Sequence, residues 1–529
     1  MKRKIISILF AVVLVLSFSL MAAVPAAAED TITVGPSGCS YTSIQAAIDA
    51  ASPNDTINVE PGTYLETIDV TKNNLIIQSV SGDPSNTIID ANGADSPVVT
   101  IADCSGVTLS GFTITGAQEP PGGGSRGIQM LRATGCTVSN IVVTKTGPLT
   151  AGRESAAIYL EGSSGNSFDS VTVSEISGGH VSGILLTGSN SNTFASTTIS
   201  GITASEFKKE ARGIWVTGGE NNKFVDTEVT GITSLNSKAL GIYADGNGNT
   251  FTSTEVSDIH GRTRVAGIQI CHTTGVEFSD YHISNLTAEA YDSWGIRVFN
   301  GVTGCTFSGG SITGADIGVF VEKNEGGTGN SIHNTNIVGN GTFGVQNTAA
   351  PTIDATLNWW GTTDETTIRG MVMGNVLYDP WLKAPYRPTT LMSSFTIDHA
   401  KIDFKRKVDD AKVRVQGELE LDLANGDGVV LGEDVIVTVG PLTETITMVE
   451  KGKKGDRWHY QQRPKEDGTG DIKHMTINWK NGKFDIRMDK ADLTGVTNPM
   501  TISIQIGDDV GEETITMREK KDHWDYKAK

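Results

Sequence analysis

The sequence lacks the cysteine pattern of a disulfide scaffold or a zinc module. Its five cysteines, Cys39, Cys104, Cys136, Cys271 and Cys305, are scattered, odd in number and never spaced as CxxC. Such modules need paired or closely spaced thiols, so we expect free cysteines. Cys136 and Cys305 occupy the same place in a repeat, TGC followed by Thr, which favours packing in the interior.

Aromatic residues are also sparse, at 6%, while glycine is frequent, at 61 of 529 residues. No stretch between residues 100 and 350 keeps a helical period, which argues against helical bundles and repeats that alternate strands with helices. The formal net charge is −19, which argues against nucleic acid or anionic lipid as a partner. This composition is typical of a protein built from short strands and many turns.

Only one run is apolar enough to interact with a membrane, and it lies at the N-terminus. The basic residues 2–4 precede the apolar run 5–20, and Ala26-Ala27-Ala28 follows. This order predicts a signal peptide over residues 1–28, although an uncleaved membrane anchor is the alternative. Loss of the three basic residues changes the charge from −19 to −19 − 3 = −22. We therefore expect a secreted or cell-surface protein that contacts the membrane only through the signal peptide.

Two markers recur in step through the middle of the chain. The first is a small residue followed by Ile or Val, repeated every 23–30 residues at Gly127-Ile128, Ala157-Ile158, Gly183-Ile184, Gly213-Ile214, Gly241-Ile242, Gly267-Ile268, Gly295-Ile296, Gly318-Val319 and Gly344-Val345. The second is an apolar position at Leu109, Val138, Phe168, Phe194, Phe224, Phe251, Phe278, Phe307 and Ile332. The runs around these markers are rich in Thr and β-branched residues with a period of two, which predicts strands. A coil of short strands repeated in this way indicates a β-solenoid whose stacked coils share one core.

A third row of small polar residues lies two positions after the second marker. Its members are Gly111, Asn140, Ser170, Ser196, Asp226, Ser253, Asp280, Gly309 and Asn334. Such residues tolerate the left-handed backbone conformation, so we interpret this row as a structural ladder. A single amphipathic helix is expected over residues 41–51, where it would cover the open end of the stack.

The motifs resemble a known superfamily. The run SIQAAIDAASPNDTINVEPGTY at 43–64 resembles the opening of pectin-lyase-like β-helix proteins, and the repeats at 100–345 resemble their NosD-like, carbohydrate-binding and sugar-hydrolase (CASH) branch. NWWG at 358–361 and YDPWL at 378–382 are similar to the closing segment of such proteins. The resemblance covers about residues 31–385 and implies an all-β, right-handed parallel β-helix with an N-terminal capping helix. It does not specify an activity, because the superfamily includes lyases, glycosidases, epimerases and adhesins.

The repeat ends near residue 385, and the composition then changes. We expect the β-helix over residues 29–385, a linker over 386–394 and a smaller antiparallel β-sandwich-like domain over 395–529. The sequence ITMVEK at 446–451 followed by Trp458 is echoed by ITMREK at 515–520 followed by Trp524, which indicates an internal duplication. We expect both tryptophans to anchor the core of the duplicated unit.

Candidate binding residues follow from the first marker. If each Ile points inward, the next residue points outward, and this outward row is Gln129, Tyr159, Leu185, Trp215, Tyr243, Gln269, Arg297, Phe320 and Gln346. A parallel outer row two residues further on includes Glu161, Asp245, Cys271, Phe299 and Glu322. We predict a polysaccharide groove centred on Trp215 and Tyr243, with Tyr159, Gln269, Arg297 and Phe320 as further substrate-binding residues. The alternative is that these stacked rows only stabilise the solenoid surface.

Catalytic residues are harder to assign. Asp245, Arg297 and Glu322 are the weak candidates, but Asp245 and Glu322 lie three coils apart, about 14 Å at the usual strand spacing, whereas glycosidases need carboxyls about 5–10 Å apart. A polysaccharide lyase would also need carboxylates to hold Ca²⁺. The histidines show no ligand spacing, so no transition-metal site and no other cofactor is expected. A non-catalytic structural or adhesive protein of the cell envelope is therefore the alternative to glycan binding or modification.

Overall fold

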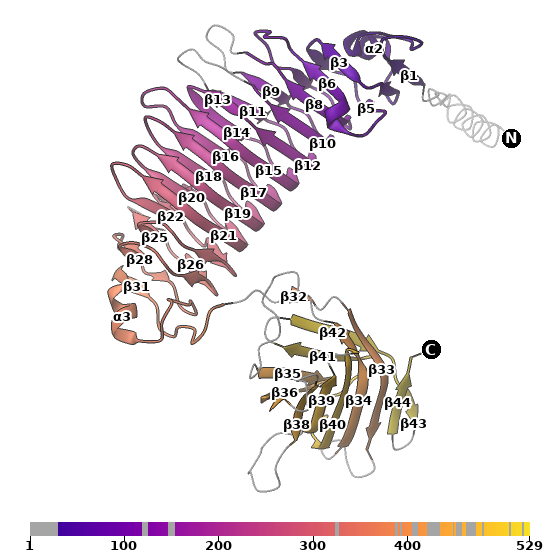
Figure 1. Cartoon of the computed structure of the whole chain (residues 1–529), viewed down its shortest axis with the longest axis vertical. Coiled ribbons are helices and arrows are strands. Elements are labelled where there is room, and N and C mark those ends of the chain that lie inside the picture. The colour runs from indigo at the N-terminus through magenta and orange to yellow at the C-terminus, as the bar shows by residue number, and fades with distance from the viewer. Residues whose placement is uncertain are drawn as a thin grey trace, which may run out of the picture. The chain divides into compact units, whose positions relative to one another are not determined.

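The computed structural model describes two compact units, Met1–Tyr386 and Arg387–Lys529 (Figure 1). The described residues are 30–118, 125–146, 154–322, 327–386, 390–391, 394–404, 411–420, 434–447, 449–450, 457–461, 472–478, 481–506, 509–520 and 523–528. The predicted signal peptide lies outside these ranges. Within them, no helix has the length and apolar character needed to span a membrane.

The first unit is a parallel β-solenoid whose coils are stacked side by side (Figure 1). One wall is a sheet formed by β4 (Ile68–Val70), β7 (Val99–Ala102), β9 (Arg126–Leu131), β11 (Glu154–Glu161), β14 (His180–Thr187), β16 (Ala211–Thr217), β18 (Ala239–Asp245), β20 (Val265–Cys271), β22 (Ser293–Phe299), β25 (Ile317–Glu322), β28 (Phe343–Asn347) and β30 (Val372–Gly374). We call it the site sheet. Its strands are parallel and follow one another along the chain, one per coil, which is the arrangement that the repeat length predicts.

The remaining walls belong to a second, larger parallel sheet, in which the longer strands bend around a corner of the coil. Its strands are β1 (Thr31–Val34), β2 (Thr56–Val59), β3 (Gly62–Leu65), β5 (Ile76–Ser79), β6 (Thr87–Asp90), β8 (Thr108–Thr115), β10 (Thr137–Thr144), β12 (Ser167–Ser174), β13 (Ile176–Gly178), β15 (Thr193–Ala204), β17 (Lys223–Ser234), β19 (Thr250–Gly261), β21 (Glu277–Ala288), β23 (Thr306–Ser308), β24 (Ser311–Ile312), β26 (Ser331–His333), β27 (Asn336–Ile337), β29 (Ile353–Asp354) and β31 (Val376–Leu377).

The predicted interior column is confirmed. Ile184 pairs with Ile214, and Ile214 with Ile242, and all three side chains are fully buried in one core. The second marker forms another column, in which the rings of Phe168, Phe194, Phe224, Phe251, Phe278 and Phe307 stack at centroid distances of 4.4–5.1 Å. Equivalent residues therefore stack because each coil repeats the backbone path of the one before it.

The polar ladders have a structural role as well. Every member of the third row has a positive φ, from 46° at Ser196 to 80° at Gly111, so the predicted left-handed conformation is confirmed. A further ladder was not predicted: buried Asn166, Asn192, Asn222 and Asn249 are linked by side-chain hydrogen bonds of 2.9–3.0 Å. These amides satisfy backbone groups in the turns, which would otherwise be costly to bury.

The expected N-terminal helix is present as α2 (Ile44–Ala50). Ser43 is its N-cap, and Glu66 accepts hydrogen bonds from the backbone N–H groups of Ile44 and Gln45. The helix buries Ile44, Ala47 and Ile48 in the solenoid core, and its role as a cover for the stack stays a prediction. Two short helical segments, η1 (Pro84–Asn86) and α3 (Glu365–Gly370), are the other described helices of this unit.

The second unit is antiparallel except for the short pairing of β32 and β42, and it has one hydrophobic core. One sheet has the order β32 (Thr390–Leu391), β42 (Asp509–Ile515), β41 (Met500–Ile506), β35 (Asp434–Val439) and β36 (Leu442–Thr447). The other has the order β37 (Val449–Glu450), β38 (Arg457–Gln461), β39 (Ile472–Asn478), β40 (Lys483–Ala491), β34 (Ala411–Glu420), β33 (Ser394–Asp403), β44 (His523–Lys527) and β43 (Arg518–Lys520).

The strand order of this unit is symmetric. Strands β33–β38 and β39–β44 occupy equivalent positions, and the two echoed sequences form equivalent hairpins in which Glu450 pairs with Trp458 and Glu519 with Trp524. Trp524 packs partly buried against the core. The side chain of Trp458 lies outside the part that the structure describes.

Candidate functional site

The predicted outward row lies on the outer face of the site sheet. Its members pair across consecutive strands in the order Gln129, Tyr159, Leu185, Trp215, Tyr243, Gln269, Arg297, Phe320 and Gln346. Exposure varies along the row. Tyr159, Trp215, Tyr243 and Phe320 are half-buried, whereas Gln269 and Arg297 are only 8% and 3% exposed. The row is therefore a continuous column, but other side chains cover parts of it.

A second outward row lies three residues before the first, and it was not predicted. At Gly213 an added Cβ would lie 2.3 Å from the Val229 Cγ1 atom, so this glycine faces the interior, as Ile214 does. Two consecutive inward positions place Arg212 on the same outer face as Trp215. Along the neighbouring coils this row continues as Leu240, Ala266, Trp294, Ile317 and Phe343, and the first four of these are buried in an apolar cluster outside the solenoid core.

Arg212 is the centre of a charged cluster on this face, and it is only 8% exposed. Its guanidinium carbon lies 3.7 Å from the ring centroid of Trp215 and 5.7 Å from that of Tyr243. It forms ion pairs with Glu154, at 3.5 Å, and with Glu210. One face of the Trp215 ring is therefore already occupied by a cation, so a ligand would contact the rest of this ring and the Tyr243 ring.

The two carboxyl groups of this cluster have opposite pKa shifts. Burial raises the pKa of Glu154, and the attraction of Arg212 and Arg126 offsets only part of that effect. Burial acts on Glu210 in the same direction, but Arg212 together with Lys238, whose Nζ lies 2.8 Å from Glu210, lowers its pKa overall. Both carboxyl groups contact the same guanidinium, so they lie close together, as the two carboxyls of a glycosidase do. Carboxyls with separated pKa values are suited to act as acid and base.

His180 lies beside this cluster. Its Nδ1 accepts a hydrogen bond of 3.4 Å from the backbone N–H of Glu210. Burial lowers the pKa of His180, and the nearby cations Arg212, Lys209 and Lys238 lower it further. A neutral imidazole is therefore favoured there.

Arg297, a predicted candidate, forms a separate buried centre. It donates hydrogen bonds to Gln269 Oε1 at 2.9 Å and, from Nε, to Glu322 Oε2 at 3.2 Å. Its guanidinium lies 4.4 Å from the ring centroid of Phe299 and 4.8 Å from that of Trp294. The arginine side chain is only 4% exposed, so this ion pair differs from a weak surface pair. Removing either partner alone would destabilise the sheet, since it would leave an uncompensated buried charge.

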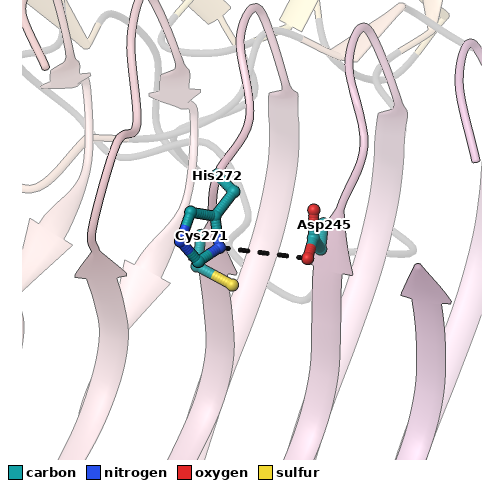
Figure 2. A group of neighbouring side chains, drawn as sticks. All are labelled: Asp245, Cys271 and His272. Carbon is teal, nitrogen blue, oxygen red and sulfur yellow. Dashed lines mark ion pairs between the residues drawn. The ribbon is translucent and has the colours of Figure 1, made fainter. Parts of the chain in front are cut away.

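Asp245 lies apart from that pair. His272 lies beside it, with 4.0 Å between Asp245 Oδ2 and His272 Nδ1 (Figure 2). Burial raises the pKa of Asp245, although His272 opposes this. On the neighbouring strand, Cys271 Sγ lies 2.8 Å from the Tyr243 hydroxyl. The structure thus brings Arg297 and Glu322 together and places Asp245 with Cys271 and His272.

The comparisons with known proteins bear on the fold. Residues 80–234 match the family described as the right-handed β-helix region. Together with the observed solenoid, this match confirms the predicted right-handed parallel β-helix and, at the level of the fold, the resemblance to pectin-lyase-like proteins. No curated protein matches the chain by sequence.

Several solved structures are similar in outline. They include the catalytic domain of a GH87 α-1,3-glucanase (15% identity, 66% of this chain and 69% of that chain, TM-score 0.48). Others are the periplasmic alginate epimerase AlgG (12%, 66% and 84%, TM-score 0.39) and PfbA, a surface adhesin of Streptococcus pneumoniae (12%, 67% and 91%, TM-score 0.37). Similarities this low do not indicate an activity for this chain.

Proposed function

We propose that this protein is secreted or held at the cell surface and binds polysaccharide along the outer face of the site sheet, around Arg212, Trp215 and Tyr243. The observation that carries the proposal is the Arg212 cluster, where two half-buried aromatic rings meet a cation and two carboxyls on one face. Aromatic rings offer apolar surface to sugar rings, and charged groups beside them bind hydroxyls. The Trp215 and Tyr243 rings meet edge to face, with centroids 6.0 Å apart.

The buried charge supports a ligand role. Arg212 Nε and Trp215 Nε1 are buried atoms with no hydrogen-bond partner among the described residues. Buried donors in a folded protein usually have a partner. A sugar hydroxyl would supply an acceptor for either group once the side chains that cover these atoms move aside on binding.

The test is retention by insoluble polysaccharides, with a panel of neutral and acidic glycans. The full chain should be depleted from solution by at least one of them, and the variant Trp215→Ala with Tyr243→Ala should lose this retention. A matched control is Tyr378→Ala with Trp381→Ala, because these rings also lie close together (6.4 Å) and Lys383 also stacks on the tryptophan. Equal retention of the two double variants, or no retention on any glycan, would contradict the proposal.

A second candidate function is modification of the bound glycan, and the opposite pKa shifts of Glu154 and Glu210 favour it. Glu154, with the raised pKa, would donate a proton, and Glu210 would act as the base or nucleophile. New chain ends should appear when the protein is incubated with the glycan that retains it. Glu154→Gln and Glu210→Gln should each abolish this release while retention persists. Release that survives both substitutions, or no release from any retained glycan, would refute the catalytic role.

A further inference from the structure

Three potential metal ligands meet at the end of two neighbouring strands of the site sheet. Asp245 is the last residue of β18, Cys271 is the last residue of β20, and His272 follows it directly. One ligand atom from each residue lies within 4.8 Å of the other two. Figure 2 shows the imidazole and the carboxylate directed toward each other across the two strands.

We propose that Asp245, Cys271 and His272 bind a divalent transition metal ion, with Zn²⁺ as the best match. A thiolate, an imidazole and a carboxylate are ligands that Zn²⁺ takes at about 2.0–2.3 Å. Ca²⁺ is a poor match, because it needs six to eight oxygen ligands. Three protein ligands would leave one position of a tetrahedral ion open. This proposal does not depend on glycan binding. Tyr243 belongs to the proposed glycan-binding face, and its hydroxyl also lies 2.8 Å from Cys271 Sγ.

The backbone and a neighbouring amide orient the histidine. His272 has a φ of 47°, in the left-handed region, which is uncommon for a non-glycine residue. Its Nε2 lies 2.9 Å from the side-chain nitrogen of Asn300. If the Asn300 amide is turned so that its oxygen accepts from Nε2–H, the lone pair of Nδ1 faces Asp245 and the metal. This is the usual way in which a second partner fixes the tautomer of a metal-binding histidine.

The distances require a small contraction. Ligand atoms around a tetrahedral Zn²⁺ lie about 3.3–3.8 Å apart, whereas Asp245 Oδ2 and His272 Nδ1 are 4.0 Å apart and the widest spacing in the group is below 4.8 Å. The side chains of Asp245 and His272 are 31% and 56% exposed, so both can move inward. The buried Cys271 would be the fixed ligand.

The charge balance is also favourable. Metal binding displaces the Cys271 thiol proton to solvent, and the resulting thiolate with the Asp245 carboxylate neutralises a divalent cation. The Tyr243 hydroxyl, 2.8 Å from Sγ, can then donate its hydrogen bond to the thiolate. No oxidation or reduction takes place.

The experiment uses Co²⁺ as a spectroscopic probe on the full chain under reducing conditions. We expect one equivalent of Co²⁺ to bind and to give a thiolate-to-metal charge-transfer band that Zn²⁺ abolishes by displacement. Cys271→Ser should remove the band, and Asp245→Asn and His272→Ala should each weaken Co²⁺ affinity at least ~10-fold.

The matched control is Cys39→Ser, because Cys39 is the most accessible of the five cysteines and lies far from the proposed site in the sequence. It should leave the band and the affinity unchanged. A band that disappears with Cys39→Ser, a band that persists in Cys271→Ser, or no band at stoichiometric Co²⁺ would overturn the proposal. The substitutions at Asp245 and His272 keep the test valid if Cys271→Ser fails to fold, since these side chains are partly exposed, unlike that of Cys271.

Discussion

Replacement of Arg212 by Met tests whether the charged cluster on the site sheet is as desolvated as its geometry indicates. The substitution removes the guanidinium that pairs with Glu154 and Glu210 but keeps an unbranched apolar side chain against Trp215. Glu210 keeps Lys238 at 2.8 Å, so the main loss is at Glu154, for which Arg126 remains as a nearby cation. Breaking a buried ion pair usually costs about 3–5 kcal/mol, and we expect about 3 kcal/mol here, at the low end of that range.

The control is Arg132→Met. Arg132 also forms an ion pair, with Asp103 at 2.6 Å, but both side chains are 62% exposed. An exposed pair contributes less than about 1 kcal/mol, so this variant should unfold almost like the natural protein. The triple variant Glu154→Gln, Glu210→Gln, Arg212→Met removes the unpaired charges and should regain most of the lost stability.

The assay is denaturant unfolding combined with hydrogen exchange, because a solenoid is stabilised by contacts between neighbouring coils and local opening can precede global unfolding. Arg212→Met should lower the unfolding midpoint and reduce protection in β14, β16 and β18. If Arg212→Met is as mild as Arg132→Met, the cluster is solvated and the desolvation argument is wrong.

Two further predictions concern the solenoid core and the pH dependence of stability. Phe224→Ala removes a fully buried ring between Phe194 and Phe251, so it should destabilise the protein by about 3–5 kcal/mol in denaturant unfolding. Phe207→Ala, at a 67% exposed ring, is the control and should change the stability little. Similar effects of the two substitutions would contradict the stacked column. The pKa of His180 lies below its ordinary 6.5 in the folded protein, so its stabilising contribution is complete above about pH 6.5 and is lost as the pH falls below that value. The unfolding midpoint of the natural protein should therefore fall relative to that of His180→Gln as the pH is lowered from 7 toward 5, and a constant difference would show that the imidazole is not desolvated.

The sequence by itself determined the solenoid and its internal columns. A stacked coil places residues one repeat apart directly against each other, so the spacing of the Gly-Ile pairs was enough to predict the column of Ile184, Ile214 and Ile242. The same reasoning predicted the left-handed row and the outward column with Trp215 and Tyr243, because alternation along a strand fixes which side chains share a face.

The tertiary structure decided which side chains meet on that outer face. Strict alternation places Arg212 inward, but the two inward positions at Gly213 and Ile214 turn it outward onto Trp215. Glu154 joins it from β11, two coils earlier, and Glu210 from the loop just before β16, and the direction and exposure of these long side chains set their pKa values. No spacing in the sequence predicts such a cluster, because loops of variable length precede the strands of the site sheet. Only the folded chain determines where the charged side chains of these loops lie.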